Sequence, residues 1–474
     1  MTRMEYDLTI LGGGSGGLTA ARVAASLGAR VLLVEKERLG GECLYTGCVP
    51  SKSLIHVARI VQQARVASRF GVISTEASVD MERVAASIQE IIKRVSDAEQ
   101  VYTKDVTVAF GQASFQSSTM LLLNDSQISS RTILIATGSR PAQPQIEGLA
   151  DVGYLTNEDV FQLTRLPPSL LIIGGGPVGV ELSQALARLG VQVTLLQRSA
   201  RILPKEDPDV SDAIATVLAA DGVKLVTGTG ALKAERVGSK KRILAGQGEQ
   251  TATFDADEIL FATGRQPNLT GLNLAAAGVV YTPRGITVND YLQTSSAPIF
   301  ALGDVLGDYL FTHVAAYQAG VAVRNALLPI GRTKVNYRVV PWCTFTDPEA
   351  ARVGLTYSEA QQHYQQARTV TMPWAEIDRA QTELAPTGFL KLVLAGKKER
   401  IVGAHLVGAH AGELLGEIAV AMRHNLTISQ LLATIHPYPT LHTGLHQVVY
   451  EAYLSGATAK TNRSIVQLAL RLRR

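Results

Sequence analysis

The stretch Tyr6–Glu35, YDLTILGGGSGGLTAARVAASLGARVLLVE, decides the fold of this 474-residue chain. Its apolar pattern predicts a strand over Tyr6–Leu11, a helix over Leu18–Leu27 and a second strand over Arg30–Val34. A glycine-rich turn at residues 12–17 joins the first strand to the helix. Because two strands joined through a helix run parallel, the stretch predicts an α/β fold with a parallel sheet.

The glycine-rich turn predicts a dinucleotide site. Glycines allow a tight turn and let a pyrophosphate approach the helix N-terminus, where backbone N–H groups favour negative charge. Glu35 closes the second strand and is expected to bind a pair of ribose hydroxyls. A glycine triplet alone is a weak signal, but here the strand, the helix and the acid agree in their spacing. The expected contacts are Gly12, Gly14, Ser15, Gly16, Gly17 and Glu35.

The same unit recurs later in the chain. A strand is predicted over residues 170–173, a glycine turn at 174–179 opens a helix, and another strand comes next over 191–196. The sequence EILFATGRQP at 258–267 also echoes TILIATGSRP at 132–141. Two copies of one unit make a chance glycine match implausible, so we expect a second dinucleotide site.

The two copies differ where the second strand ends. Gln197 replaces Glu35 at the same distance from the glycine turn, and Arg198, Ser199 and Arg201 come directly after it. A carboxylate accepts hydrogen bonds from a free 2′-hydroxyl and repels a 2′-phosphate, whereas a neutral side chain with arginines favours the phosphate. We therefore expect NADPH rather than NADH; an ordinary pair of solvated arginines is the alternative. The expected contacts are Gly174, Gly176, Val178, Gly179, Arg198 and Gly264.

A pair of cysteines lies just beyond the first unit, in Gly40–Lys52, GGECLYTGCVPSK. Pro50 suits the first turn of a helix, so the sulfur of Cys48 is expected at a helix N-terminus. The partial positive charge there stabilises a thiolate, and Lys52 is expected to add to it. The chain has three cysteines, which argues against a four-cysteine zinc site or a disulfide framework. Two alternatives remain. The cysteines could belong to a metal site completed by histidines, or Cys43 and Cys48 could be a pair of inert buried thiols.

Together with the two nucleotide units, this stretch resembles the redox-active disulfide of the flavoprotein disulfide reductases. That family includes dihydrolipoyl dehydrogenase, glutathione reductase and mercuric reductase. The resemblance runs from Met4 to about Tyr453 and implies FAD in the first unit and NAD(P)H in the second. It also implies that Cys48 touches the flavin as the charge-transfer thiolate, while Cys43 is the interchange thiol that meets the substrate.

The resemblance implies further site residues. Glu181 is expected to pair with Lys52 near the flavin, and Asp304, which ends IFALGD, is expected to hold the ribityl chain. The alternative is a structural role, in which Asp304 caps the helix predicted over residues 313–328. Pro177 and Val178 stand where many family members place a gating tyrosine. The remaining expected FAD contacts are the main chain near Ala113 and the turn at Gly138.

Length and pattern predict three domains: two Rossmann-like nucleotide-binding domains and a C-terminal α+β dimerisation domain. The FAD-binding domain is expected over residues 1–150 and 281–336, the NAD(P)-binding domain over 151–280, and the dimerisation domain over 337–474. After the cysteine pair, and before the second glycine turn, helices are predicted over residues 54–70 and 79–100. The resemblance implies an obligate homodimer in which two chains build each active site. We expect His405 and His410 to be hydrogen-bonding residues of the interface rather than metal ligands.

The stretch Ile435–Gln447, IHPYPTLHTGLHQ, departs from the family pattern. Disulfide-acting members carry a His–Glu dyad that serves the partner's interchange thiol as acid and base. Here Tyr438 and Thr443 occupy those two positions. Mercuric reductase also has the tyrosine, but it ends in a cysteine pair that this chain lacks. The nearby histidines that are candidates for the missing base are His436, His442 and His446.

We therefore expect an FAD enzyme that passes electrons from NADPH through the cysteines to a small electrophile or a metal ion. The alternatives are a dihydrolipoyl or glutathione-type disulfide reductase, or a flavoprotein subunit or redox-responsive partner of a larger complex. The residues expected to carry the chemistry are Cys43, Cys48, Lys52, Glu181, Tyr438 and His442.

Composition and charge argue against nucleic-acid and membrane partners. The formal charge is +4, and no block of Lys and Arg indicates nucleic-acid binding. The N-terminus lacks a signal-peptide pattern, and clustered glycines and arginines interrupt the apolar run Leu8–Val34. Three cysteines with a single closely spaced pair are typical of a protein in a reducing cytoplasm. No membrane partner is expected. The residues 464–474 are expected to form a frayed basic tail, with a membrane-surface or partner role as the alternative.

Overall fold

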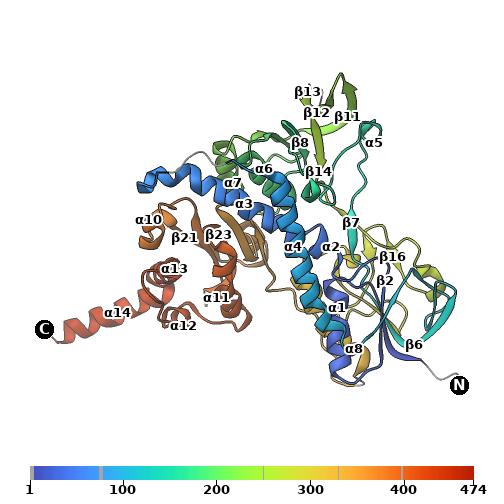
Figure 1. The fold of residues 1–474 in the computed structure, drawn as a ribbon. Helices are drawn as coiled ribbons and strands as arrows, with labels where there is room; N and C mark the ends of the chain where they lie inside the picture. The colour runs from blue at the N-terminus through green and yellow to red at the C-terminus, as the bar shows by residue number, and fades with distance from the viewer. Residues whose placement is uncertain (1–4, 74–77, 249, 329, 397–398, 474) are drawn as a thin grey trace.

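Three main sheets and their covering helices organise the chain, as Figure 1 shows. The computed structural model describes residues 5–73, 78–248, 250–328, 330–396 and 399–473. None of the helices in these ranges has both the length and the apolar character needed to cross a bilayer. The mixed α/β fold predicted from the sequence is confirmed.

The first sheet has seven strands in the order β3-β2-β1-β6-β5-β4, with β18 also paired to β6. Strands β1, β2, β3, β6 and β18 run parallel to one another. Strand β5 extends the sheet antiparallel to the long strand β6, and β4 is antiparallel to β5. The strands are β1 (Tyr6–Leu11), β2 (Val31–Glu35), β3 (Thr107–Phe110), β4 (Ala113–Phe115), β5 (Met120–Leu123), β6 (Ser126–Ile135) and β18 (Ile299–Ala301). The helices of this part are α1 (Ser15–Ser26), α2 (Gly41–Tyr45), α3 (Cys48–Val66), α4 (Met81–Glu99) and α8 (Thr312–Leu327).

The second sheet repeats the centre of the first. Its four parallel strands have the order β10-β9-β8-β14, so that β9-β8-β14 corresponds to β2-β1-β6. An antiparallel ribbon of three strands, β11-β12-β13, adjoins it. The strands are β8 (Ser169–Ile173), β9 (Gln192–Leu196), β10 (Lys224–Val226), β11 (Gly230–Val237), β12 (Lys240–Gln247), β13 (Gln250–Ala256) and β14 (Glu258–Phe261). The helices are α5 (Leu149–Val152), α6 (Pro177–Arg188) and α7 (Pro208–Ala220).

The third sheet is antiparallel, in the order β19-β20-β23-β22-β21. Its buried side chains and those of α11 and α13 form one apolar core around Trp374. The strands are β19 (Pro341–Thr344), β20 (Glu349–Gly354), β21 (Ala367–Pro373), β22 (Phe389–Ala395) and β23 (Arg400–Gly408). The helices are α9 (Tyr357–His363), α10 (Asp378–Thr382), α11 (Ala411–Arg423), α12 (Ile428–Leu432), α13 (His442–Ser455) and α14 (Ala457–Leu472).

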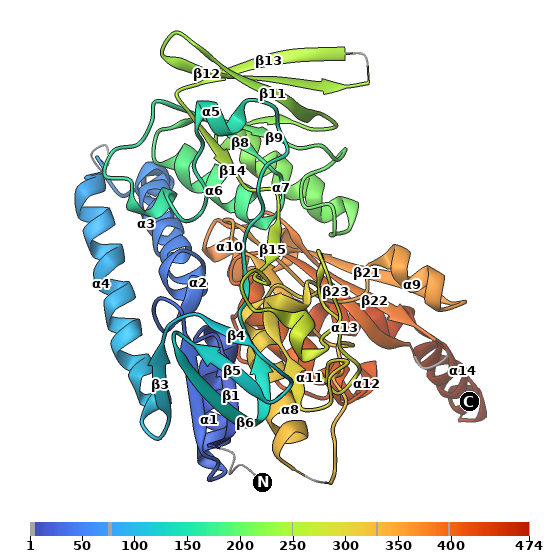
Figure 2. The same cartoon turned by 90° about the vertical axis from the view of Figure 1, so that its right-hand side faces the viewer.

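Short elements link these layers. Strand β7 (Ser139–Pro141) pairs with β15 (Arg265–Pro267), which ties the first sheet's loops to those of the second. A smaller ribbon joins β16 (Tyr281–Thr282) to β17 (Gly285–Ile286). Helices α3 and α4 run side by side along one flank of the molecule, as Figure 2 shows. The 3-10 helices are Ala67–Phe70, Gln100–Thr103, Val160–Gln162, Leu274–Ala277, Gly303–Leu306 and Trp374–Glu376.

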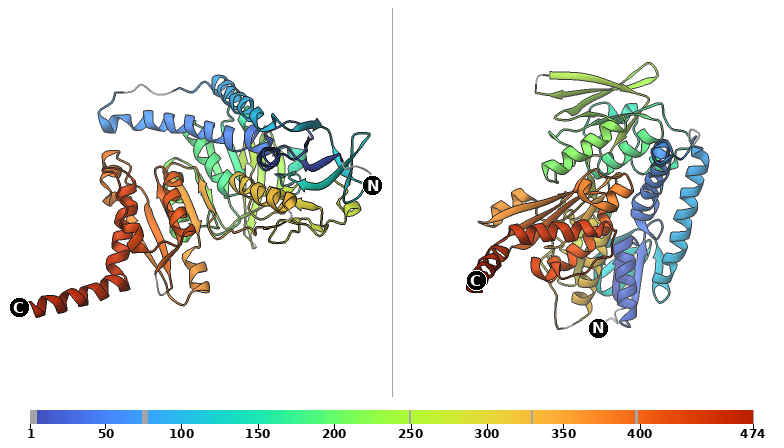
Figure 3. Two further views of the ribbon diagram at one scale, coloured as in Figure 1. Left: turned by 90° about the horizontal axis from the view of Figure 1, so that it is seen from below. Right: turned by 90° about the vertical axis from the view of Figure 1, so that its left-hand side faces the viewer.

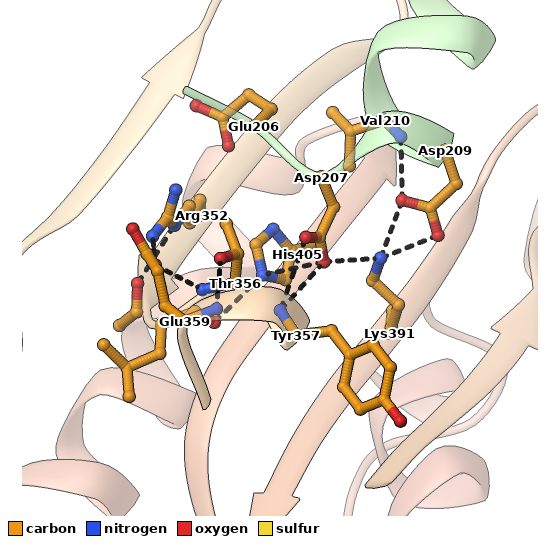
Figure 4. A network of polar contacts seen from close by, with 12 residues as sticks. Glu206, Asp207, Asp209, Val210, Arg352, Thr356, Tyr357, Glu359, Lys391 and His405 are labelled. Carbon is orange, nitrogen blue, oxygen red and sulfur yellow. Dashed lines mark hydrogen bonds and ion pairs between the residues drawn. The ribbon is translucent and has the colours of Figure 1, made fainter. Parts of the chain in front are cut away.

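A buried polar network joins the second unit to the third sheet (Figure 4). Asp207, just before α7, lies 2.8 Å from Nζ of Lys391 on β22. Its Oδ2 also lies 3.6 Å from Nε2 of His405 on β23, a fully buried ring that contacts the Leu355 carbonyl at 3.1 Å. Burial lowers the pKa of His405 to about 4, so the ring is neutral near pH 7. The interface role expected for His405 is therefore wrong: the ring is buried within its own chain.

One helix prediction needs correction at its ends. Helix α3 begins at Cys48 and ends at Val66, earlier at both ends than the predicted 54–70. The segment TILIATGSRP contains the end of β6 and the whole of β7, and Gly138 adopts φ +67° between these two strands. The division into three domains at the stated boundaries stays a prediction.

Candidate active site

The turn between β1 and α1 is shaped for a ligand phosphate. Gly12 has φ +108°, and a Cβ on Gly17 would lie 1.8 Å from the Gly12 carbonyl oxygen. No side chain caps α1 at Gly14, so the first-turn N–H groups have no capping acceptor. The N–H of Gly13 donates to Oε2 of Glu35 at 2.6 Å, which fixes that carboxylate at the end of β2. These features fit the pyrophosphate and ribose of FAD.

The turn between β8 and α6 repeats this geometry. Gly174 has φ +118°, and a Cβ on Gly179 would lie 1.8 Å from the Gly174 carbonyl oxygen. Again no side chain caps the helix, whose cap residue is Gly176. The N–H of Gly175 donates to Oε1 of Gln197 at 3.0 Å, as Gly13 does to Glu35. The turn therefore fits the pyrophosphate of NAD(P)H.

The two arginines that come after Gln197 have different surroundings. Nε of Arg201 lies 3.1 Å from Oδ1 of Asp212. Arg198 is exposed, and within the described ranges it forms no ion pair. Arg198 is thus the guanidinium that is free to meet a ligand phosphate. Val178, in the first turn of α6, is 46% exposed.

Cys43 on α2 and Cys48 at the start of α3 lie together. Both are free thiols, and Cys43 hydrogen-bonds to Cys48. Sγ of Cys48 also lies 3.6 Å from Oγ1 of Thr312, the first residue of α8. The hydrogen bond from Cys43 lowers the pKa of Cys48 to about 6, and the Thr312 hydroxyl and the Lys52 charge act in the same direction. The pKa of Cys43 is raised by the same contact and by burial, so Cys48 is the thiolate.

Lys52 lies one turn further along α3. Its Nζ is 2.8 Å from Oε2 of Glu181, a buried carboxylate on α6. Oε1 of Glu181 accepts the N–H of Phe345 at 2.9 Å, and the Phe345 ring lies under the ammonium at 4.5 Å. The pair therefore joins the cysteine helix, the second nucleotide unit and the strand region of the third sheet.

Asp304 belongs to a second polar cluster. Its Oδ2 accepts the hydroxyl of Ser139 at 2.6 Å and lies 3.7 Å from Nε of Arg265. Arg265 also forms an ion pair with Glu42, next to Cys43. The alternative that Asp304 caps α8 is wrong, because no side chain caps that helix. A carboxylate at the end of β18, beside the first glycine turn's sheet, suits a ribityl hydroxyl.

The other expected contacts are distributed around the two units. Ala113 is buried on β4 and pairs with Leu123. Gly138 accepts the N–H of Asn268 at 3.0 Å, and Gly264, with φ +96°, accepts the N–H of Ala142 at 3.1 Å. The roles of these residues in cofactor binding stay predictions.

Tyr438 and Thr443, which occupy the positions of the family's dyad, belong to the part of the chain that forms the third sheet and its helices. The hydroxyl of Tyr438, which is 73% exposed, donates to Oδ2 of Asp378 at 2.8 Å, and that contact raises the pKa of Tyr438 above its ordinary value. The hydroxyl of Thr443 donates to the Thr440 carbonyl at 2.6 Å. Neither side chain is held as an acid–base dyad. Within the described ranges, no group of three or more His, Cys, Asp or Glu is arranged to hold a metal ion.

A histidine–carboxylate pair does lie near these residues. Nε2 of His436 is 2.9 Å from Oε2 of Glu417 on α11, and its Nδ1 is buried without a hydrogen-bond partner. The rings of His442 and His446 lie at centroid distances of 6.0 Å and 5.8 Å from that of His436. The structure therefore gives the carboxylate to His436 rather than to His442.

Sequence reasoning missed several residues of the site. These contacts join residues that are far apart in the chain, such as Cys48 and Thr312, and no local motif marks them. The missed residues are Glu42, Arg265, Thr312, Asp378 and Glu417.

Comparisons with known proteins agree with this arrangement. The family model of the pyridine nucleotide-disulphide oxidoreductases matches residues 6–320, and that family's dimerisation domain matches residues 340–449. The second match indicates a homodimer.

Individual relatives cover nearly the whole chain. A mercuric reductase of Bacillus cereus is 35% identical over 449 residues, covering 94% of this chain and 71% of the relative. A dihydrolipoyl dehydrogenase of Bacillus subtilis is 33% identical over 468 residues, covering 94% and 98%. The Cu(II) complex of the HOCl-induced flavoprotein disulfide reductase RclA from Escherichia coli has a TM-score of 0.84 and 29% identity, covering 94% and 99%. The chain therefore belongs to the pyridine nucleotide-disulphide oxidoreductases, flavoprotein enzymes that use FAD and NAD(P)H.

Proposed function

We propose that this enzyme is an NADPH-dependent reductase of metal ions or small electrophiles that works through Cys43 and Cys48. When bound, FAD supplies the means of accepting a hydride from NADPH and reducing the disulfide. One NADPH releases one proton and gives two electrons, which reduce one Hg(II) to Hg(0) or two Cu(II) to two Cu(I). The relatives named mercuric reductase and the solved Cu(II) complex of RclA support this acceptor class.

The observation that carries the proposal is the state of Tyr438 and Thr443. Reduction of a disulfide substrate requires a proton for the leaving thiolate, and a well-placed acid contributes about 10²–10⁴-fold. The hydroxyl of Tyr438 donates to Asp378, which raises the pKa of Tyr438, and the hydroxyl of Thr443 donates to the carbonyl of Thr440 just before α13. A soft metal ion binds thiolates directly and needs no such proton.

The chain's own residues then have distinct parts in the proposed reaction. Cys48 is the thiolate held beside Thr312 and in the field of Lys52. Cys43, with its raised pKa, is the protonated thiol, and it binds a metal ion as the thiolate after releasing its proton to water. Tyr438 and Thr443 are proposed to line the partner subunit's site, since the matched dimerisation domain contains them.

The first test measures NADPH oxidation with Cu(II) or Hg(II), with glutathione disulfide, with lipoamide and with a quinone. We expect measurable metal-ion and quinone turnover and weak turnover with both disulfides. The variant Cys43→Ser is expected to abolish metal-ion turnover and to leave quinone reduction, which needs only the flavin. Metal-ion turnover that survives in Cys43→Ser would show that the thiols are not the route.

The second test restores the missing dyad. The double variant Tyr438→His, Thr443→Glu is expected to raise turnover of a disulfide by about 10²-fold. Tyr438→Phe is the matched control, because it removes the hydroxyl without adding a base. If the unchanged enzyme already reduces a disulfide at the rate of the dyad variant, Tyr438 does not limit disulfide reduction and the proposed acceptor class is wrong.

One observation favours a disulfide reductase as the second candidate. His436 and Glu417 form an imidazole–carboxylate pair, the chemistry that a thiol-directed acid requires. In that case glutathione disulfide or lipoamide turns over readily and His436→Asn removes that turnover while metal-ion reduction remains. His442→Gln and His446→Gln serve as matched controls, since within the described ranges neither of those rings pairs with a carboxylate.

A further inference from the structure

Helix α14 (Ala457–Leu472) is an arm that leaves the body of the molecule. It continues from α13 and extends away from the sheets, as Figures 1 and 3 show. Every residue from Thr461 to Arg473 is exposed. Because the helix buries none of these side chains in its own chain, any burial of its apolar face requires a surface outside the chain.

The arm carries large apolar side chains in a helical pattern. Ile465, Leu468 and Leu472 recur at i, i+3 and i+7 and form one stripe, and they are 59%, 59% and 80% exposed. Val466 and Leu470 add further exposed apolar surface, each 54% exposed. Such a cluster of exposed apolar residues on one element marks an interaction surface rather than scattered surface leucines.

The arm is also purely cationic. After Glu451 the chain has no acidic residue, and the basic residues of this segment are Lys460, Arg463, Arg471, Arg473 and Arg474. Arg463, Gln467 and Arg471 recur at i, i+4 and i+8 and form a polar stripe beside the apolar one. The partner of this surface must therefore be both apolar and anionic.

The arm lies outside the part of the chain that is shared with the family. The dimerisation-domain match ends at residue 449, before α14 begins. Pairing of two such arms would bring like charges together, because neither contributes an acid. The helix has 16 residues, whereas a bilayer-spanning helix needs about 20 apolar ones, so it is suited to lie on a bilayer rather than cross it.

We propose that α14 docks on an anionic lipid surface. Ile465, Leu468 and Leu472 enter the boundary between headgroups and acyl chains, and the arginines meet the lipid phosphates. The reductase is thereby recruited to the membrane surface as a peripheral protein. This proposal is independent of the identity of the electron acceptor.

The test is co-sedimentation of the full-length, FAD-loaded enzyme with vesicles. One set contains phosphatidylcholine alone and the other a mixture with phosphatidylglycerol. We expect binding to the anionic vesicles that weakens with added salt, and little binding to phosphatidylcholine. Equal binding to both sets, or no binding to the anionic set, would overturn the proposal.

Variants locate the contact. The double variant Leu468→Gln, Leu472→Gln is expected to abolish binding, and Arg463→Gln, Arg471→Gln to weaken it about 25-fold, from about fivefold per arginine. Leu27→Gln is the matched control, since Leu27 is 58% exposed at the far end of α1. NADPH–quinone activity is expected to be unchanged in all three, which shows that they fold.

Sedimentation velocity tests whether a second copy of the chain, rather than lipid, covers the arm. If the leucine variant forms a smaller assembly than the unchanged enzyme and neither binds vesicles, the arm covers a second copy of the chain and the lipid proposal is wrong. If the assembly is the same and only vesicle binding is lost, the lipid proposal stands.

Discussion

The two βαβ units of this chain, β1-α1-β2 and β8-α6-β9, have almost the same backbone and differ in the side chain that ends the second strand. In the first unit Glu35 accepts the N–H of Gly13 at 2.6 Å, and in the second Gln197 accepts the N–H of Gly175 at 3.0 Å. The amide thus preserves the hydrogen bond that shapes the turn while it removes the negative charge. The difference separates what the fold needs at this position from what the ligand needs.

The units differ again in the elements that come after them. After Glu35 the chain enters α2 and α3, which bear Cys43 and Cys48, whereas after Gln197 it enters α7. One copy is therefore joined to the redox centre and the other to the polar network at Asp207 (Figure 4). Internal repetition supplied two sites of one shape, and the residues around each site assign them different ligands.

The largest effects are expected from substitutions that distort the two glycine turns one at a time. A methyl group on Gly17 or Gly179 would lie 1.8 Å from a backbone oxygen, so each unit must distort to accept alanine. Gly17→Ala is expected to yield protein without FAD, and Gly179→Ala to retain FAD but lose about 100-fold in kcat/KM for NADPH. Flavin absorbance and steady-state kinetics measure both. Gly416→Ala, where a methyl group meets open space on α11, is the control.

The next prediction makes the second unit resemble the first. Gln197→Glu keeps an acceptor for the Gly175 N–H but adds a charge that repels a 2′-phosphate. We expect the ratio of kcat/KM for NADPH to that for NADH to fall by about ten- to hundredfold. An unchanged ratio would show that the 2′-phosphate lies elsewhere.

Arg198→Gln is expected to have a somewhat smaller effect, of about tenfold on the same ratio and mainly through KM for NADPH, because it removes one charge-assisted hydrogen bond without adding a negative charge. Arg201→Gln is the matched comparison. Arg201 is already paired with Asp212, so its removal is expected to change the ratio little. Equal effects of the two variants would contradict the assignment to Arg198.

The smallest expected effect concerns the cysteines that distinguish the first unit. The pKa of Cys48 is lowered to about 6, so its thiolate is present above that pH and is protonated below it. The charge-transfer absorbance of the two-electron-reduced enzyme is expected to rise with pH about a midpoint near 6. Lys52→Met removes a cation and is expected to move the midpoint upward by about one pH unit or less. A midpoint that stays the same would assign the lowered pKa to Cys43 and Thr312 alone.

Local pattern was sufficient for much of the fold. The predicted strand over Tyr6–Leu11 has the observed bounds of β1, and the glycine turns lie where the spacing placed them. Cys48 lies at the start of a helix, as Pro50 indicated. These features depend on residues adjacent in the chain, so the sequence contains their physical cause.

Contacts between distant segments were not predictable in the same way. Thr312 approaches Cys48 only because α8 packs behind the first sheet, and Asp378 reaches Tyr438 from another helix of the third layer. The helix at residues 457–472 was also missed, since its apolar residues alternate closely with arginines and suggest a frayed tail. Tertiary packing decides such positions, and a single sequence does not display it.

The most direct test of the proposed function is an anaerobic titration with NADPH and then addition of an acceptor. Two electrons per FAD are expected to produce the charge-transfer band of the Cys48 thiolate. Hg(II) or Cu(II) is then expected to remove that band rapidly, while glutathione disulfide and lipoamide leave it nearly unchanged. Rapid loss of the band with either disulfide, and none with the metal ions, would contradict the proposed function.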